Sequence, residues 1–154
     1  MKLSHILFAA CTLLLLSLTA YMGLEVDGRT GYARHFMLGV LSGLFTCFVH
    51  VIYFMYFVVQ QKIMAEAILH HGLDAGFAPR VQKMKSRALM WCMAGFVAIL
   101  TTAGLGGAID ASGVSARMHQ YAAFITIAVE AVVFYGQIVL LGDYRELFRE
   151  AFNE

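Results

Sequence analysis

Residues 121–141, YAAFITIAVEAVVFYGQIVLL, decide the fold, because Glu130 is the only charged side chain among them. A bilayer core about 30 Å thick needs roughly 20 apolar residues in one helix, and this stretch has that length. Three more segments of the same kind occupy residues 3–22, 36–59 and 88–109. Segments this long cannot cross lipid as open strands, because their backbone polar groups would stay unpaired. We therefore expect an all-α integral membrane protein, a bundle of four spanning helices.

The composition of the whole chain agrees with this fold class. Of its 154 residues, 60% are hydrophobic and only 14% are charged, against about 45–50% and about 25% in soluble proteins. The length suits one domain, so we expect a single transmembrane domain over residues 1–154. A net charge of +1 gives no reason to expect nucleic acid as a partner. The sequence contains no P-loop and no HExxH motif, so we do not expect an enzyme that works on its own.

The three cysteines, Cys11, Cys47 and Cys92, all lie inside the apolar segments. Their number is odd and no two of them form a CxxC motif, so neither a disulfide framework nor a zinc ribbon is expected. We interpret them as small packing residues of the spanning helices.

The distribution of Lys and Arg predicts the orientation of the chain. The connection 60–87 holds the largest group of basic side chains, which are Lys62, Arg80, Lys83, Lys85 and Arg87. The other two connections together hold only Arg29, Arg34 and Arg117. Because short basic connections stay in the cytoplasm, we expect the connection 60–87 and both termini on the cytoplasmic side. The membrane would be a bacterial inner membrane.

Helical structure should continue beyond the lipid at that end. Gly72 can cap a second helix that runs to about His71, and Pro79 suits the first turn of the third helix. In residues 143–152, apolar and charged side chains alternate at helical spacing. This pattern predicts an amphipathic helix that lies on the inner membrane surface or docks on a partner. For the whole chain, the expected partners are the lipid bilayer and other membrane subunits or further copies of the chain.

The other two connections resemble each other and indicate an internal repeat. Each contains an Asp, a turn Gly, an Ala-Arg pair and then a His where the next span opens. The Asp and His residues are Asp27 and His35 in the first connection, and Asp110 and His119 in the second. The protein would then consist of two tandem helical hairpins, related by an axis along the membrane normal. His35 and His119 would be equivalent residues at the same depth.

Polar and small residues inside the spans fall on single helical faces. They are Gly39, Gly43, Thr46 and His50 in the second span, and His119, Thr126, Glu130 and Gln137 in the fourth. No other Asp, Glu, Lys or Arg lies as deep in a span as Glu130. An ionisable group at that depth is costly unless it is paired or neutral, and it usually faces the bundle interior.

The helical rise predicts which of these residues share a level. At 1.5 Å per residue, His50 lies about 22 Å below His35, and Glu130 lies about 17 Å below His119. We therefore predict two pairs in one bundle. His35 and His119 would lie near the outer surface, and His50 and Glu130 would lie just past the midplane.

The first functional hypothesis is a b-type haem protein that serves electron transfer in a respiratory-type complex. Four-helix bundles commonly hold cofactors between side chains on facing helices, and histidine is a usual haem ligand. His35 and His119 are the best axial pair, because the repeat makes them equivalent, and His50 is a second candidate. Gly39 and Gly43 would leave room for the porphyrin or let another helix approach closely.

Three other hypotheses stay open. One is a metal or quinone site at the outer surface, formed by Asp27, His35, Asp110 and His119. Another is a non-catalytic accessory subunit of a larger membrane complex, whose polar pairs only hold helices together. The last is a proton path through His50, Glu130, Thr126 and Gln137.

Overall fold

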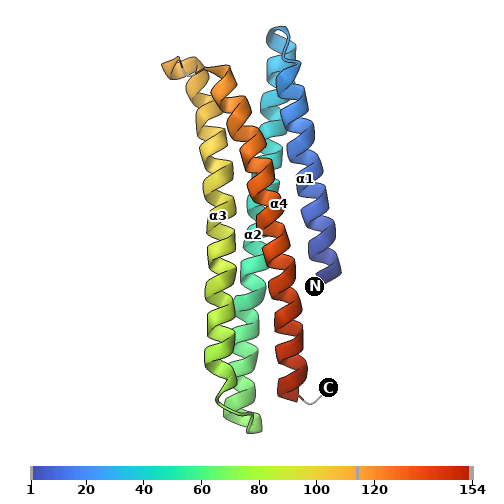
Figure 1. Cartoon of the computed structure of the whole chain (residues 1–154), viewed down its shortest axis with the longest axis vertical. Coiled ribbons are helices and arrows are strands. Elements are labelled where there is room, and N and C mark those ends of the chain that lie inside the picture. Colours follow the sequence, from blue (N-terminus) through green and yellow to red (C-terminus); the bar gives the residue numbers. More distant parts are fainter. Residues whose placement is uncertain (1, 114, 153–154) are drawn as a thin grey trace.

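The computed structural model describes residues 2–113 and 115–152, and these form a bundle of long helices (Figure 1). The helices are α1 (Lys2–Leu24), α2 (Gly28–His71), α3 (Phe77–Ser112) and α4 (Ala116–Phe152). All four are long and apolar enough to cross a membrane. The expected all-α fold class is confirmed for the described residues, and the predicted spans are the apolar parts of longer helices.

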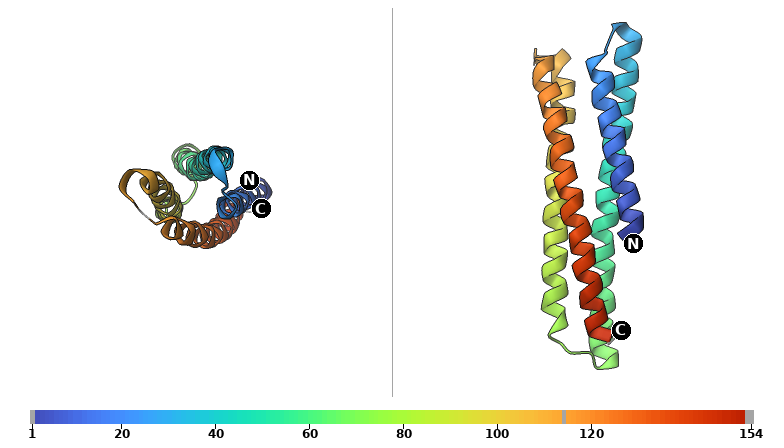
Figure 2. Two further views of the ribbon diagram at one scale, coloured as in Figure 1. Left: turned by 90° about the horizontal axis from the view of Figure 1, so that it is seen from above. Right: turned by 45° about the vertical axis from the view of Figure 1, so that its right-hand side comes forward.

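The helices are arranged as two antiparallel hairpins. Each helix packs against its neighbour in sequence, and α1 closes the ring by packing against α4. The connections between α1 and α2 and between α3 and α4 lie at one end of the bundle, which we call the loop end. The two hairpins diverge towards the loop end (Figure 2).

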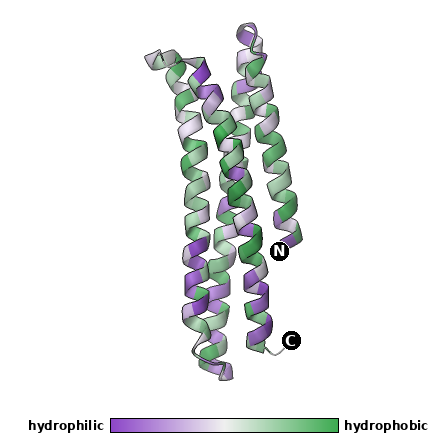
Figure 3. Cartoon of the chain, in the orientation of Figure 1, coloured by the Kyte–Doolittle hydropathy of each residue, from purple (hydrophilic) through white to green (hydrophobic). Residues whose placement is uncertain are grey.

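At the opposite end, α2, α3 and α4 extend past the start of α1 (Figure 1). We call residues 60–71, 77–87 and 143–152 the charged extension, because hydrophilic residues gather there (Figure 3). As predicted, α2 ends at His71, and Gly72 caps it with a left-handed φ of 69° and a hydrogen bond from its N–H to the Ala67 carbonyl. Pro79 lies in the first turn of α3.

Residues 143–152 differ from the expected separate helix. They are the end of α4, and Tyr144, Leu147 and Ala151 are buried in a cluster with side chains of α2 and α3. Outside this cluster, Arg80 of α3 forms a bidentate salt bridge with Glu150, with both N–O distances 2.7 Å. The part of the apolar face formed by Tyr144, Leu147 and Ala151 is therefore covered by the chain itself, whereas Phe152 is exposed. The covering helices α2 and α3 extend past the start of α1 at the same end, which the periodicity of 143–152 alone does not reveal.

The interior of the spanning part is more polar than its outer surface. Large apolar side chains such as Leu14, Leu44 and Tyr135 are exposed, as expected where helices face lipid. The buried interior holds the polar side chains His5, Thr12, Ser42, Thr46, His50, Thr126, Glu130 and Gln137. Because an unpaired polar group in lipid is costly, the fold turns these groups towards one another, and the candidate sites lie between the helices.

Candidate functional site

The structure brings His35 of α2 and His119 of α4 together near the loop end. Their ring centroids are 6.0 Å apart and the ring planes make an angle of 74°. The Nδ1 atom of His35 lies 3.1 Å from the Thr19 carbonyl oxygen of α1, and the Nδ1 atom of His119 lies 3.1 Å from the Thr102 carbonyl oxygen of α3. Each ring is thus held by the other helix of its own hairpin.

These backbone contacts determine which ring nitrogen carries the hydrogen. A carbonyl oxygen can only accept, so Nδ1 must donate in both histidines. A neutral imidazole then keeps a lone pair on Nε2. Metal-bound histidines usually donate their other ring N–H to a carbonyl or carboxylate in the same way. His35 and His119 therefore present two Nε2 lone pairs at one level of the bundle.

Matching hydroxyl pairs lie one or two turns deeper in each hairpin. In the first hairpin, the Thr19 and Ser42 hydroxyl oxygens are 2.8 Å apart. In the second, the Thr102 and Thr126 hydroxyl oxygens are 2.7 Å apart. The residues whose carbonyls hold the histidines thus also tie the two helices of each hairpin together. Thr126 belongs to this level and not to the deeper pair, to which the sequence assigned it.

The glycines that make room for the two histidines are Gly23 and Gly106. A Cβ atom at Gly23 would lie 2.8 Å from the His35 ring, and one at Gly106 would lie 2.9 Å from the His119 ring. Both distances are too short for a real side chain, so only glycine lets these rings lie against α1 and α3. The sequence analysis missed both glycines, although each follows a threonine by four residues, at Thr19 and Thr102.

The glycines named from the sequence, Gly39 and Gly43, have other neighbours. A Cβ at Gly39 would lie 3.6 Å from Thr19 of α1, and one at Gly43 would lie 3.9 Å from Ile99 of α3. Both are ordinary van der Waals distances. Alanine would therefore fit at either position, and the atoms nearest to these two glycines are not histidine atoms.

The proposed metal set is only partly brought together. Asp27 is the exposed N-cap residue of α2 and forms no side-chain cap hydrogen bond. Within the described residues, no group of three or more His, Cys, Asp or Glu side chains could hold a metal ion. The Asp110 side chain lies outside the described part of the chain. A centre of three or more such ligands at this level would thus need Asp110.

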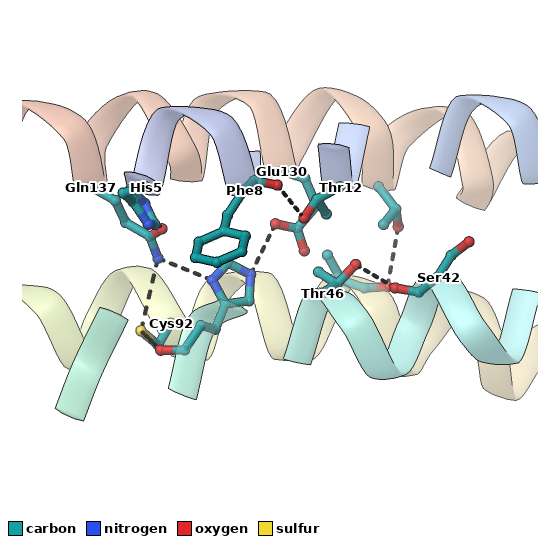
Figure 4. Close-up of polar contacts among 11 residues, drawn as sticks. His5, Phe8, Thr12, Ser42, Thr46, Cys92, Glu130 and Gln137 are labelled. Carbon is teal, nitrogen blue, oxygen red and sulfur yellow. Dashed lines mark hydrogen bonds and ion pairs between the residues drawn. The ribbon is translucent and has the colours of Figure 1, made fainter. Parts of the chain in front are cut away.

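A second polar cluster lies deeper, where side chains of several helices face one another (Figure 4). The predicted contact between His50 and Glu130 is present: His50 Nε2 lies 3.0 Å from Glu130 Oε2, and both side chains are fully buried. His50 Nδ1 lies 3.0 Å from Gln137 Nε2. Gln137 Oε1 in turn lies 2.9 Å from His5 Nε2 of α1. One hydrogen-bonded chain therefore joins α1, α4 and α2.

The His50 ring is enclosed on several sides. It stacks on Phe134, with centroids 5.3 Å apart, and meets the edge of Phe96 at 5.7 Å. The Cys92 thiol donates to the His50 backbone carbonyl, with a distance of 3.3 Å. A Cβ atom at Gly95 would collide with the ring. The position of His50 is thus determined by packing as well as by hydrogen bonds.

Two buried polar atoms of this region have no hydrogen-bond partner among the described residues, Glu130 Oε1 and the Tyr53 hydroxyl. Such groups are rare and costly in protein interiors. Glu130 Oε1 belongs to the carboxyl group that accepts from His50. It is therefore an open position for a proton or for a small polar ligand.

Of the residues in this cluster, the sequence analysis missed His5, Cys92 and Gly95. His5 lies in the first turn of α1, and its side chain is only 3% exposed. Its ring lies against Tyr53, with centroids 4.9 Å apart and the ring planes tilted by 32°. A helical-face analysis of residues 3–22 would have paired His5 with Thr12 at a seven-residue step.

Comparison of the chain with protein-family models, curated proteins and solved structures found no match.

Proposed function

We propose that the chain is an integral membrane electron-transfer protein that holds one b-type haem between α2 and α4, as a subunit of a respiratory-type complex. The observation that carries this proposal is the pair of rings at His35 and His119. Each ring keeps its Nε2 lone pair because its Nδ1 donates to a backbone carbonyl. Haem would supply one-electron transfer, and the chain would supply its two axial ligands.

The spacing of the two rings fits this role. Two imidazoles on opposite sides of one metal ion, each with a metal–nitrogen bond of about 2 Å, have ring centroids roughly 6 to 6.5 Å apart. The centroids of His35 and His119 are 6.0 Å apart. Small side chains beside the rings, Gly23 and Gly106, support the proposal further, because they leave the rings free to lie against their helices.

We also propose that the two hairpins are an internal repeat, and that its two copies have diverged at the deeper level. Matching contacts support the repeat, since His35 and His119 bond to threonine carbonyls of their preceding helices in the same way. Counting on from each histidine, Glu130 corresponds to Thr46, and Phe134 corresponds to His50. One copy thus contributes the base and the other the acid of the buried pair.

The second candidate function is a non-catalytic accessory subunit of a larger membrane complex. It is favoured by the number of buried polar side chains that already bond within the chain, such as His50 with Glu130 and Gln137. In that case both polar levels would only hold helices together. The two candidates differ in one measurable property, which is the presence of haem.

A reduced-minus-oxidised absorption spectrum of the detergent-purified protein tests the first candidate. We expect a b-type spectrum and one haem per chain. Gly106→Ala should lower the haem content severalfold, because its Cβ would push the His119 ring out of place. Gly107→Ala is the matched control, since its Cβ would meet nothing within 4 Å. A wild-type protein without haem, after expression with sufficient haem supply, would overturn the proposal in favour of the accessory subunit.

We propose that the charged extension lies in the cytoplasm of a bacterium, with the loop end in the periplasm. The basic side chains of residues 60–87 support this orientation. Alkaline phosphatase fused after Glu154 should therefore be inactive, because this reporter works only outside the cytoplasm. The same enzyme inserted after Gly113, at the loop end, should be active. The reverse pattern would show that the orientation is wrong.

A further inference from the structure

The hydrogen bonds of the deeper cluster all point in one direction. Gln137 Oε1 is a carbonyl oxygen, so the 2.9 Å contact requires His5 Nε2 to donate. Gln137 Nε2 is an amide N–H, so it donates to His50 Nδ1 at 3.0 Å. His50 then carries its hydrogen on Nε2 and donates to Glu130 Oε2, also at 3.0 Å. The donors therefore run from His5 to Glu130 without a break.

The two ends of this chain have different surroundings. At the far end, Glu130 Oε1 is buried and has no hydrogen-bond partner among the described residues. At the near end, His5 lies one helical turn from Lys2, which is exposed. Lys2 Nζ lies against Gly142, next to the start of the charged extension at Asp143, 3.4 Å from the place of a Gly142 Cβ. The chain thus leads from a buried histidine one turn from an exposed lysine to a carboxyl group inside the bundle.

We propose that His5, Gln137, His50 and Glu130 form a proton relay that loads one proton on Glu130 when the site of His35 and His119 receives an electron. This inference rests on the proposed function, because the electron has to be held at that site. The electron donor would be a reduced one-electron carrier of the respiratory chain. The proton comes from water on the side of the charged extension.

One proton enters the relay at His5, and one proton is bound at Glu130. His5 takes a proton on Nδ1 from water and passes its Nε2 hydrogen to Gln137 Oε1. Gln137 passes an Nε2 hydrogen to His50 Nδ1, and His50 passes its Nε2 hydrogen to Glu130 Oε2. Gln137 is left as the imidic acid, which returns to the amide when its hydrogen moves from Oε1 to Nε2, so the proton count of the relay stays the same. Glu130 ends as a neutral carboxylic acid.

Electrostatics links the proton to the electron over the length of α4. Glu130 lies eleven residues after His119, which is about 17 Å along a helix. At an effective dielectric constant of about 20, one negative charge at that distance raises a proton affinity about fivefold. The other titratable groups near the pair are His5 from α1, Cys47 and Tyr53 from α2, and Cys92 from α3. Thiols and phenols are neutral near pH 7, so the imidazoles and the carboxyl group remain as proton acceptors. Glu130 Oε1, unpartnered among the described residues, assigns the proton to the carboxyl group.

A redox titration of the haem-loaded protein in detergent, repeated from acid to alkaline pH, tests the relay. We expect the midpoint potential to fall with rising pH by about 40 mV in total, since a tenfold change corresponds to 59 mV for one electron. Glu130→Gln should remove this dependence. His70→Ala, in the exposed part of α2, is the matched histidine control and should keep it.

The path itself is tested by the rate of proton uptake. His5→Phe keeps the aromatic ring against Tyr53 but interrupts the relay. We expect it to keep the pH dependence of the potential and to slow proton uptake on rapid reduction about a hundredfold, measured with a pH-indicator dye. Uptake at the wild-type rate would overturn the role of His5.

An infrared difference spectrum keeps the proposal testable if Glu130→Gln does not fold. In the wild-type protein, reduction should produce the C=O band of a protonated carboxylic acid. Haem-loaded protein without this band, or with a midpoint potential independent of pH, would overturn the relay and leave the haem proposal intact. Absence of haem from the wild-type protein would overturn both.

Discussion

Replacing His35 or His119 by alanine should remove haem b from the purified protein. Each substitution takes away one axial ligand, and the remaining imidazole is still held by its threonine carbonyl. Loss of an outer-shell partner of a metal ligand costs about 10- to 100-fold in metal affinity, so loss of the ligand itself should exceed about 100-fold. The haem content per chain, measured by the absorption of the pyridine complex, checks this result.

Two controls separate a ligand from a structural histidine. His70→Ala, at an exposed position near the end of α2, should keep the full haem content. Free imidazole added to His119→Ala should restore part of the haem binding, because it can enter the space that the side chain leaves. Retention of haem in either alanine variant would refute the axial pair. Loss of haem without rescue, together with a lower unfolding temperature, would indicate that the histidine holds the helices together.

Gly95→Ala should destabilise the fold by about 3 kcal/mol, because an inserted methyl group and a broken buried pair both contribute. The new Cβ would collide with the His50 ring. That ring cannot yield easily, since it stacks on Phe134 and bonds to Glu130 and Gln137. Any shift of the ring leaves Glu130 buried without its partner. Thermal unfolding of the protein in mild detergent measures the effect.

Gly104→Ala is the matched control in the same helix. A Cβ at Gly104 would meet nothing within 4 Å, and alanine is the better helix former by about 1 kcal/mol. This variant should therefore unfold at the same temperature as the wild-type protein or at a higher one. Equal unfolding temperatures for Gly95→Ala and the wild-type protein would mean that His50 has more freedom than its contacts imply.

The depth of each polar residue could be predicted from the sequence, because a helix rises by a constant amount per residue. That regularity placed His50 beside Glu130, and the two are hydrogen-bonded. The same reasoning put His35 level with His119, and the centroids of their rings are 6.0 Å apart. The number of spanning helices followed from the length of the apolar segments alone.

The partners of a residue across the bundle could not be predicted in this way. Periodicity gives the face of one helix, but it does not say how far that helix is rotated or shifted against its neighbours. Gly39 and Gly43 share a helical face with His50, which predicts that they leave space for a ligand of the histidines. In the structure, Gly23 and Gly106 are the glycines that lie against the histidine rings. His5 joined the deeper cluster only because α1 packs against α4.

The sequence by itself determined the four apolar helices, the levels of the His35–His119 and His50–Glu130 pairs and the polar character of the interior. These follow from the length, hydropathy and periodicity of single segments. Only the tertiary structure decided that residues 143–152 pack on α2 and α3, and that Gln137 bridges His5 and His50. These contacts join residues far apart in the chain, and they depend on helix rotation and on side-chain shape, which no single segment specifies.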